Sequence, residues 1–194
     1  MTTTYYKMLG HEGRPCHGGN GQWSLPTDDS PGEWMPKITN VKMCARGYHV
    51  VTIDQIVKWL GPEIYEVEVR GTHATSTDKS VYGQARLLRR VWQWNERTAR
   101  LFACLCAEHV LPVFERRYPD DQRPRKAIEV ARRFADGLTS RDELRNAAAS
   151  ASAYAAAAAA SSSVYAAAAA ASAYAAAAYA AAASASAYAA AASA

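Results

Sequence analysis

Four cysteine and histidine residues near the N-terminus are the side chains most suited to binding a metal ion. Cys16, His17, Cys44 and His49 fall in loops or at strand ends of one short region, and together they could supply the four ligands of a tetrahedral zinc site. No C-x2-C pair is present among them. The alternative is loop packing with a hydrogen-bonded His49, and zinc is the single cofactor candidate.

A second group, Cys104-x-Cys106-x-x-His109, has the composition of half a metal site. On a helix Cys106 and His109 share a face, but Cys104 is about 200° away from Cys106. One ion cannot readily take both thiolates in that arrangement. The pattern therefore favours small residues buried in helix packing.

Two further N-terminal motifs suggest ligand binding or catalysis. The run His17-Gly-Gly-Asn-Gly21 could hold a phosphate through backbone N–H groups, but it lacks the P-loop pattern and favours a turn. Tyr48-His49 at a strand end, with Glu66 or Glu68 nearby, is similar to small ADP-ribosyltransferase-like folds. A ligand-binding, metal-binding or enzymatic N-terminal domain is therefore one alternative for the function.

A run of polar residues flanked by tryptophans is the candidate for binding a protein partner. Tryptophan and arginine are the residue types most often found at the energetic centres of protein interfaces. The predicted partner-binding residues are Trp92, Trp94, Asn95, Arg97 and Arg100. Interhelical hydrogen bonding with a solvated face is an equally supported interpretation of the same run.

The charge distribution argues only weakly for an acidic partner. Residues 1–85 carry 8 Lys/Arg against 9 Asp/Glu, whereas residues 86–145 carry 14 against 9. The second segment is only moderately basic and does not form a basic tail, so nucleic acid is an unlikely partner. No basic stretch followed by an apolar run opens the chain, so we expect a cytoplasmic protein. The uncharged Ala-rich tract lacks Leu, Ile and Phe, so we expect no membrane span there.

The pattern of residues 1–72 predicts a small α/β domain. Strands are expected at residues 4–9, 40–45, 48–51 and 64–69, with a helix over residues 53–60 that Thr52 caps. The polar residues 73–80 are expected to form a linker.

From residue 81 the apolar spacing becomes helical, which predicts an all-α domain over residues 81–194. Mixed helices are expected over residues 81–145, the first of them long, from about residue 80 to 117, and kinked or broken at Pro112. A second helix should end at Gly137, and Thr139 or Ser140 should cap a third, with Ser140 to Glu143 matching a capping box.

The last part of the chain, residues 147–194, contains only Ala, Ser, Tyr and one Val, with 33 alanines among 48 residues. One straight helix of that length would span about 72 Å, and its tyrosines would fall on opposite faces. Stacked helical hairpins from residue 146 to 194 are therefore expected, because Ala allows close approach of helix axes. The same tract could serve in self-assembly, so a homo-oligomer or a virion element is a further alternative.

Residues 94–129 carry a specific resemblance. The segment from Trp94 to Glu115, with Cys104 and Cys106, and the run Tyr118-Pro-Asp-Asp-Gln-Arg-Pro-Arg-Lys-Ala-Ile-Glu resemble the Imm-5-like immunity-protein family. The resemblance covers about residues 86–194 and includes continuation into Ala-rich helices. Cys44-Ala-Arg-Gly-Tyr-His49 and Tyr65 to Gly71 are similar to a small domain at the start of many phage proteins.

These resemblances imply a phage or prophage protein that works by binding. The expected fold class is α+β, with a small α/β domain before an all-α domain of stacked Ala-rich hairpins. The expected function is non-enzymatic binding and occlusion of a protein partner, as in immunity or anti-defence inhibitors. The resemblances supply no catalytic residues.

Overall fold

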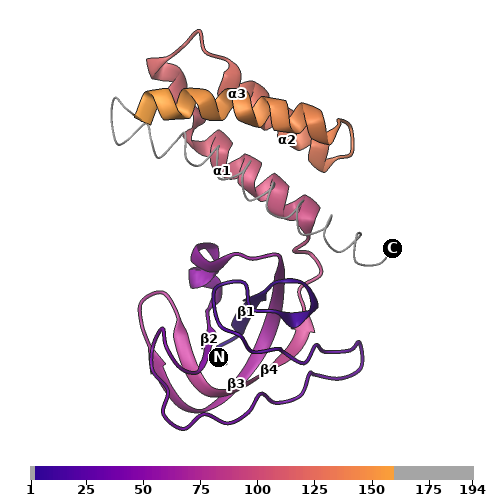
Figure 1. Ribbon diagram of the computed structural model, residues 1–194, viewed down its shortest axis with the longest axis vertical. Helices are drawn as coiled ribbons and strands as arrows, with labels where there is room; N and C mark the ends of the chain where they lie inside the picture. The colour runs from indigo at the N-terminus through magenta and orange to yellow at the C-terminus, as the bar shows by residue number, and fades with distance from the viewer. Residues whose placement is uncertain (1–2, 160–194) are drawn as a thin grey trace. The chain divides into compact units, whose positions relative to one another are not determined.

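The computed structural model describes residues 3–159, which fall into two compact units, Met1–Asn95 and Glu96–Ala194 (Figure 1). We call them the β unit and the helical unit. The β unit contains four strands and two short 3-10 helices. Their bounds are β1 (Tyr5–Leu9), η1 (His11–Gly13), β2 (Tyr48–Val50), η2 (Ile53–Trp59), β3 (Glu63–Thr75) and β4 (Ser80–Arg90).

The four strands form one antiparallel sheet in the order β1-β3-β4-β2. The sheet curls so that its two ends meet. The N–H of Tyr6 donates to the carbonyl of Val51 at 2.8 Å, and the N–H of Val51 donates back to Tyr6 at 3.0 Å. Pairing the two edges removes unsatisfied strand backbone, which otherwise attracts other chains.

Two layers of side chains fill the β unit. The larger cluster lies on one face of the sheet and consists of Leu9, Trp23, Met35, Val50, Tyr65, Val67, Ala85 and Leu87. The smaller cluster contains Met8, Val51 and Ile64, with Trp59 and Trp94 packed against it. Successive residues of a strand point to opposite faces, so neighbours such as Met8 and Leu9 enter different clusters.

An extended segment, residues 32–38, lies along the part of β4 that extends beyond its pairing with β2. The N–H groups of Gly32, Met35 and Ile38 donate to the carbonyls of Leu87, Ala85 and Gly83 at 2.9, 2.9 and 2.8 Å. The approach is close enough that a Cβ on Gly83 would lie 2.4 Å from the carbonyl oxygen of Ile38. Only glycine fits at that point of the strand.

The expected α/β character of the N-terminal domain is wrong. Residues 80–90 form a strand, not the start of a long helix, and residues 73–75 belong to β3, not to a linker. The predicted strand at residues 40–45 is a tight loop. The helix expected over residues 53–60 is the 3-10 helix η2, and its apolar residues Ile53 and Val57 are each 61% exposed. No α-helix occurs among the described residues of the β unit.

The described part of the helical unit has three helices, α1 (Glu96–Arg117), α2 (Arg123–Ala135) and α3 (Arg141–Ala159). Helix α2 packs against both α1 and α3. The core between α1 and α2 is made of small and medium side chains, namely Cys104, Ala107, Leu111 and Ile128. Pro112 lies inside α1, which continues to Arg117.

The ends of α2 and α3 follow the predicted signals. Gly137 has φ +73°, its N–H donates to Phe134, and the N–H of Leu138 donates to Arg133. These two bonds are the Schellman arrangement that ends a helix. At the start of α3 the Ser140 hydroxyl accepts the N–H of Glu143 at 3.2 Å, so the predicted cap is confirmed.

The molecule is thus α+β, with an antiparallel β unit in place of the expected α/β domain. The predicted stacking of Ala-rich hairpins concerns residues that lie largely beyond residue 159, outside the described part of the chain. Within residues 3–159, no helix has both the length and the apolar character needed to cross a membrane.

Candidate functional site

The three predicted partner-binding residues of the β unit lie just after β4 and differ in their surroundings. Trp92 is 64% exposed. Trp94 is half-buried, packs against the smaller core cluster and donates its indole N–H to the carbonyl of Gly61 at 2.8 Å. Asn95 donates to the carbonyl of Trp92 at 3.3 Å. Trp94 therefore holds the chain in place, and Trp92 offers its ring to the surface.

The other two predicted residues belong to α1. Arg97 donates to the carboxylate of Asp136 at 2.7 Å, which links the start of α1 to the end of α2. Arg100 pairs with Glu96 and lies over the ring of Phe134, with its guanidinium carbon 4.7 Å from the ring centroid. Both arginines are already engaged within the helical unit.

Trp92 belongs to a group of charged and aromatic residues that we call the Arg90 cluster. Its members are His11, Glu63, Tyr65, Arg90 and Trp92. The guanidinium carbon of Arg90 lies 4.3 Å from the centroid of the Trp92 ring. The same guanidinium donates to Oε1 of Glu63 at 3.0 Å. This carboxylate is buried, with a side chain 7% exposed, so a buried charge fixes the cation that supports an exposed ring.

The remaining contacts of Glu63 saturate its carboxylate. Nδ1 of His11 lies 3.3 Å from Oε1, and the Tyr65 hydroxyl donates to Oε2 at 2.7 Å. Burial, followed by the bond to Glu63, raises the pKa of Tyr65 well above its ordinary value of 10, so Tyr65 remains a donor. Three side chains thus contact the buried carboxylate of Glu63.

Arg90 itself is incompletely satisfied. Its Nε is buried, and no acceptor for it is present within residues 3–159. An unpaired buried donor costs about 1–3 kcal/mol. Arg90 therefore keeps one buried donor that its ion pair with Glu63 does not use.

Of the Arg90 cluster, Trp92 alone was predicted from the sequence as a partner-binding residue. Glu63 and Arg90 are 27 positions apart in the sequence. They meet because Arg90 lies opposite Tyr65 in the β3–β4 register, and Glu63 is two residues before Tyr65 on the same face of β3. That register exists because residues 80–90 form a strand, whereas the sequence pattern predicted a helix there. No local motif connects the two residues.

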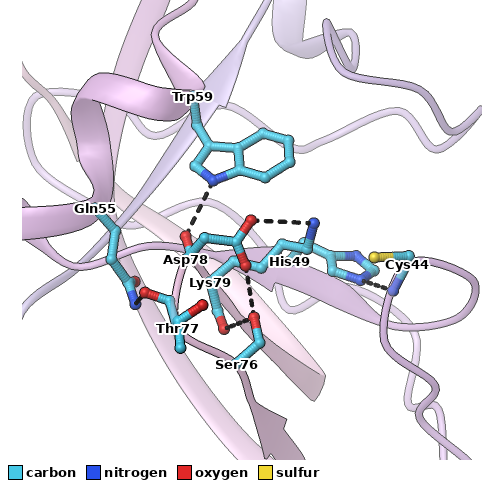
Figure 2. A network of polar contacts seen from close by, with 8 residues as sticks. All are labelled: Cys44, His49, Gln55, Trp59, Ser76, Thr77, Asp78 and Lys79. Atoms are coloured by element: carbon cyan, nitrogen blue, oxygen red, sulfur yellow. Dashed lines mark hydrogen bonds and ion pairs between the residues drawn. The ribbon is translucent and has the colours of Figure 1, made fainter.

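The structure separates the four predicted zinc ligands into two pairs. Nε2 of His17 bonds the carbonyl of Trp59 at 2.8 Å, and burial raises the pKa of the half-buried Cys16 thiol. In the other pair, Nε2 of His49 accepts the backbone N–H of Cys44 at 2.9 Å (Figure 2). Among the described residues, no three of His, Cys, Asp or Glu converge as ligands of one ion.

The other sequence candidates have local contacts. Cys104 is buried against the carbonyl of Ile128, whereas Cys106 and His109 are exposed, so the three do not converge. Glu66 and Glu68 each pair with an arginine of β4. The turn at 17–21 contains two glycines with positive φ, at positions 18 and 19.

Comparison with known proteins identifies one family. A family model described as "Imm-5 like putative immunity protein" matches residues 89–194, a segment that begins inside β4 and includes Arg90 and Trp92. Comparisons with curated proteins and with solved structures give no match. Because the matched segment is more than half of the 194 residues, the chain belongs to the Imm-5-like family of immunity-type proteins.

Proposed function

We propose that this protein binds a partner protein and blocks one of its surfaces, as a phage- or prophage-type immunity or anti-defence inhibitor. The observation that carries the proposal is the exposed Trp92 ring held on Arg90, which buried Glu63 fixes in turn. A large ring presented at low entropic cost beside a cation has the composition of an interface hot spot. Membership of an immunity-type family supports a binding role.

A protein partner is favoured over nucleic acid by how the basic residues are used. The arginines between α1 and α2 pair with carboxylates, in the pairs Arg97–Asp136, Arg125–Glu115 and Arg132–Glu108. A nucleic-acid surface needs arginines and lysines that are free to contact phosphates. These three arginines are already paired with carboxylates, so they do not form such a surface.

Site-specific photo-crosslinking tests the proposal. A photoreactive phenylalanine analogue is placed at position 92 and, as a matched control, at Leu25, an exposed apolar residue of the same unit (42% exposed). We expect one discrete protein adduct from position 92 in a host or phage lysate. An excess of wild-type protein without the photoreactive residue should abolish this adduct, whereas an excess of Trp92→Ala protein should leave it.

The captured partner is then purified and its Kd measured. Trp92→Ala should weaken binding by about thirtyfold, which corresponds to the roughly 2 kcal/mol of a hot-spot residue. Adducts that are the same at positions 92 and 25, or competition by Trp92→Ala as strong as by wild type, would refute the proposal.

A further inference from the structure

The loop before β2, residues 42–47, has a strained conformation that needs an external support. The N–H of Lys42 and the N–H of Arg46 each donate to the other residue's carbonyl at 2.8 Å, which closes a tight turn. Cys44, within this turn, has φ +61°, in the left-handed region that side chains with a Cβ disfavour. A residue held there costs about 1–2 kcal/mol unless its surroundings compensate.

His49 supplies that support. Its Nε2 accepts the backbone N–H of Cys44 at 2.9 Å, as Figure 2 shows. A ring nitrogen accepts a hydrogen bond only when it carries no proton, so the bond requires neutral His49 protonated on Nδ1. The same N–H cannot bond a protonated imidazolium.

The groups around His49 favour its neutral form. Nζ of Lys7 in β1 donates to the His49 carbonyl at 3.2 Å. From the β3–β4 turn, the amine of Lys79 lies 3.8 Å from Oδ2 of Asp78 and 4.1 Å from the centroid of the Trp59 ring. The loop contains Lys42, Cys44 and Arg46. Asp78 is the single carboxylate among the residues drawn in Figure 2.

The electrostatic effect of these neighbours has a definite sign. Burial, followed by the positive charges of Lys7 and Lys79, lowers the pKa of His49 below its ordinary value of 6.5, while a backbone hydrogen bond to Gly47 acts in the opposite direction. A base with a lowered pKa binds fewer protons in the folded protein than in the unfolded chain. Its contribution to stability is full above pH 6.5 and is lost as the pH falls below that value.

We propose that His49 is a proton-operated latch on the 42–47 loop. The neutral imidazole holds the Cys44 N–H and the loop is closed. Protonation removes the acceptor and places a third cation beside Lys7 and Lys79. The loop then opens at Cys44 while the β3–β4 pairing is retained, because the turn is held by its own bonds from Gln55 to Thr77 and from Trp59 to Asp78.

Amide hydrogen exchange of the full chain, followed by NMR and corrected for the intrinsic effect of pH, tests the latch. Between pH 7 and pH 5 the protection of the Cys44 amide should fall by up to about tenfold per pH unit, the limit for one coupled proton. The amide of Val67, in the centre of β3, should keep its protection. His49→Gln retains an acceptor that does not titrate, so its Cys44 protection should not change with pH.

His73→Gln is the matched control, because His73 is exposed and stacks on Tyr82. This variant should behave as wild type. Constant Cys44 protection in wild type, or an equal fall in His49→Gln, would overturn the proposal. If His49→Gln does not fold, the ¹⁵N shifts of the wild-type His49 ring decide, and a ring protonated on Nε2 at pH 7 would overturn the latch.

Discussion

The β unit and the helical unit use their cationic side chains in different ways. In the β unit, cations lie over tryptophan rings, in addition to the ion pairs that arginines of β4 make with Glu63, Glu66 and Glu68. The contacts are Lys7 with Trp23, Arg70 and Arg86 with Trp34, Lys79 with Trp59, and Arg90 with Trp92. In the helical unit, arginines pair with carboxylates across two helices. The difference follows from composition, because all five tryptophans of the chain precede residue 96.

The helical ion pairs form a seam in antiparallel order. Arg97, at the start of α1, meets Asp136 just after α2, and Glu115, near the end of α1, meets Arg125 near the start of α2. Between them Arg132 donates two bonds to Glu108, at 2.7 and 2.5 Å. The seam fixes the alignment of two helices whose shared core is small.

This contrast indicates where each unit obtains its stability. The β unit buries large side chains completely, including Tyr65, Leu9 and Leu87. The core between α1 and α2 includes Cys104 and Ala107, which bury far less apolar area. We therefore expect core truncation to affect the β unit more strongly than the helical unit.

The largest predicted effect comes from Leu87→Ala in β4. Leu87 is 0% exposed, so its truncation should lower the free energy of unfolding of the β unit by about 3–5 kcal/mol. Leu111→Ala, at a residue of the thinner helical core, should cost about 2–3 kcal/mol. Urea unfolding separates the two, because tryptophan fluorescence reports the β unit and far-UV helical signal reports the helical unit.

Leu138→Ala is the control for the first prediction. Leu138 is 67% exposed, and its truncation should leave both transitions nearly unchanged. A larger loss from Leu111→Ala than from Leu87→Ala would show that the helical unit depends on its core as much as the β unit does.

The second prediction concerns charge within the β unit. Glu63→Gln removes the buried partner of Arg90, and we expect a loss of about 2–3 kcal/mol in the fluorescence-detected transition. This value lies below the usual cost of breaking a buried pair because Arg90 is 25% exposed. Glu66→Gln is the matched variant on the same strand, where the partner Arg89 is 74% exposed, and it should change little. Equal losses would mean that burial of Glu63 has no special role.

The prediction of a helix in place of β4 failed because small residues occupy some of its buried positions. From Val81 to Leu87 every second residue of β4 is buried, but two of these four buried residues, Gly83 and Ala85, have almost no hydrophobic signal. Position 83 needs glycine because the carbonyl of Ile38 lies against its backbone. The spacing of Leu87, Leu88 and Val91 then resembled a helix. The partner segment that requires this glycine is remote in sequence, so a local pattern could not show it.

Helix ends were predicted better because their signals are local. Gly137 ends α2, and Ser140 begins α3, through bonds within a few residues of each other. The Arg90 cluster depends instead on strand register, and the 42–47 loop on a ring reached from β2. Trp92 was recognisable by residue type alone, whereas Glu63 and His11 were not.

The smallest predicted effect tests the helical seam. The hydrogen bond from Arg132 holds the pKa of Glu108 below its ordinary value of 4.5, against the opposing effect of burial. A carboxylate with a lowered pKa stabilises the folded state above pH 4.5, and this contribution is lost as the pH falls below that value. Because both side chains are partly exposed, Glu108→Gln should cost only about 0.5 kcal/mol at pH 7 in the helical transition.

The pH and salt dependence of the Glu108→Gln effect shows whether Glu108 stabilises the helical unit by its charge or by packing. If the pair acts by charge, the difference between wild type and Glu108→Gln should shrink between pH 5 and pH 3 and also in high salt. Glu129→Gln on α2 is the control, because Glu129 is exposed and has no ion pair with the described residues. A difference that persists at pH 3 and in salt would assign Glu108 a packing role, and the two units would then differ in the size of their cores and not in how they use charge.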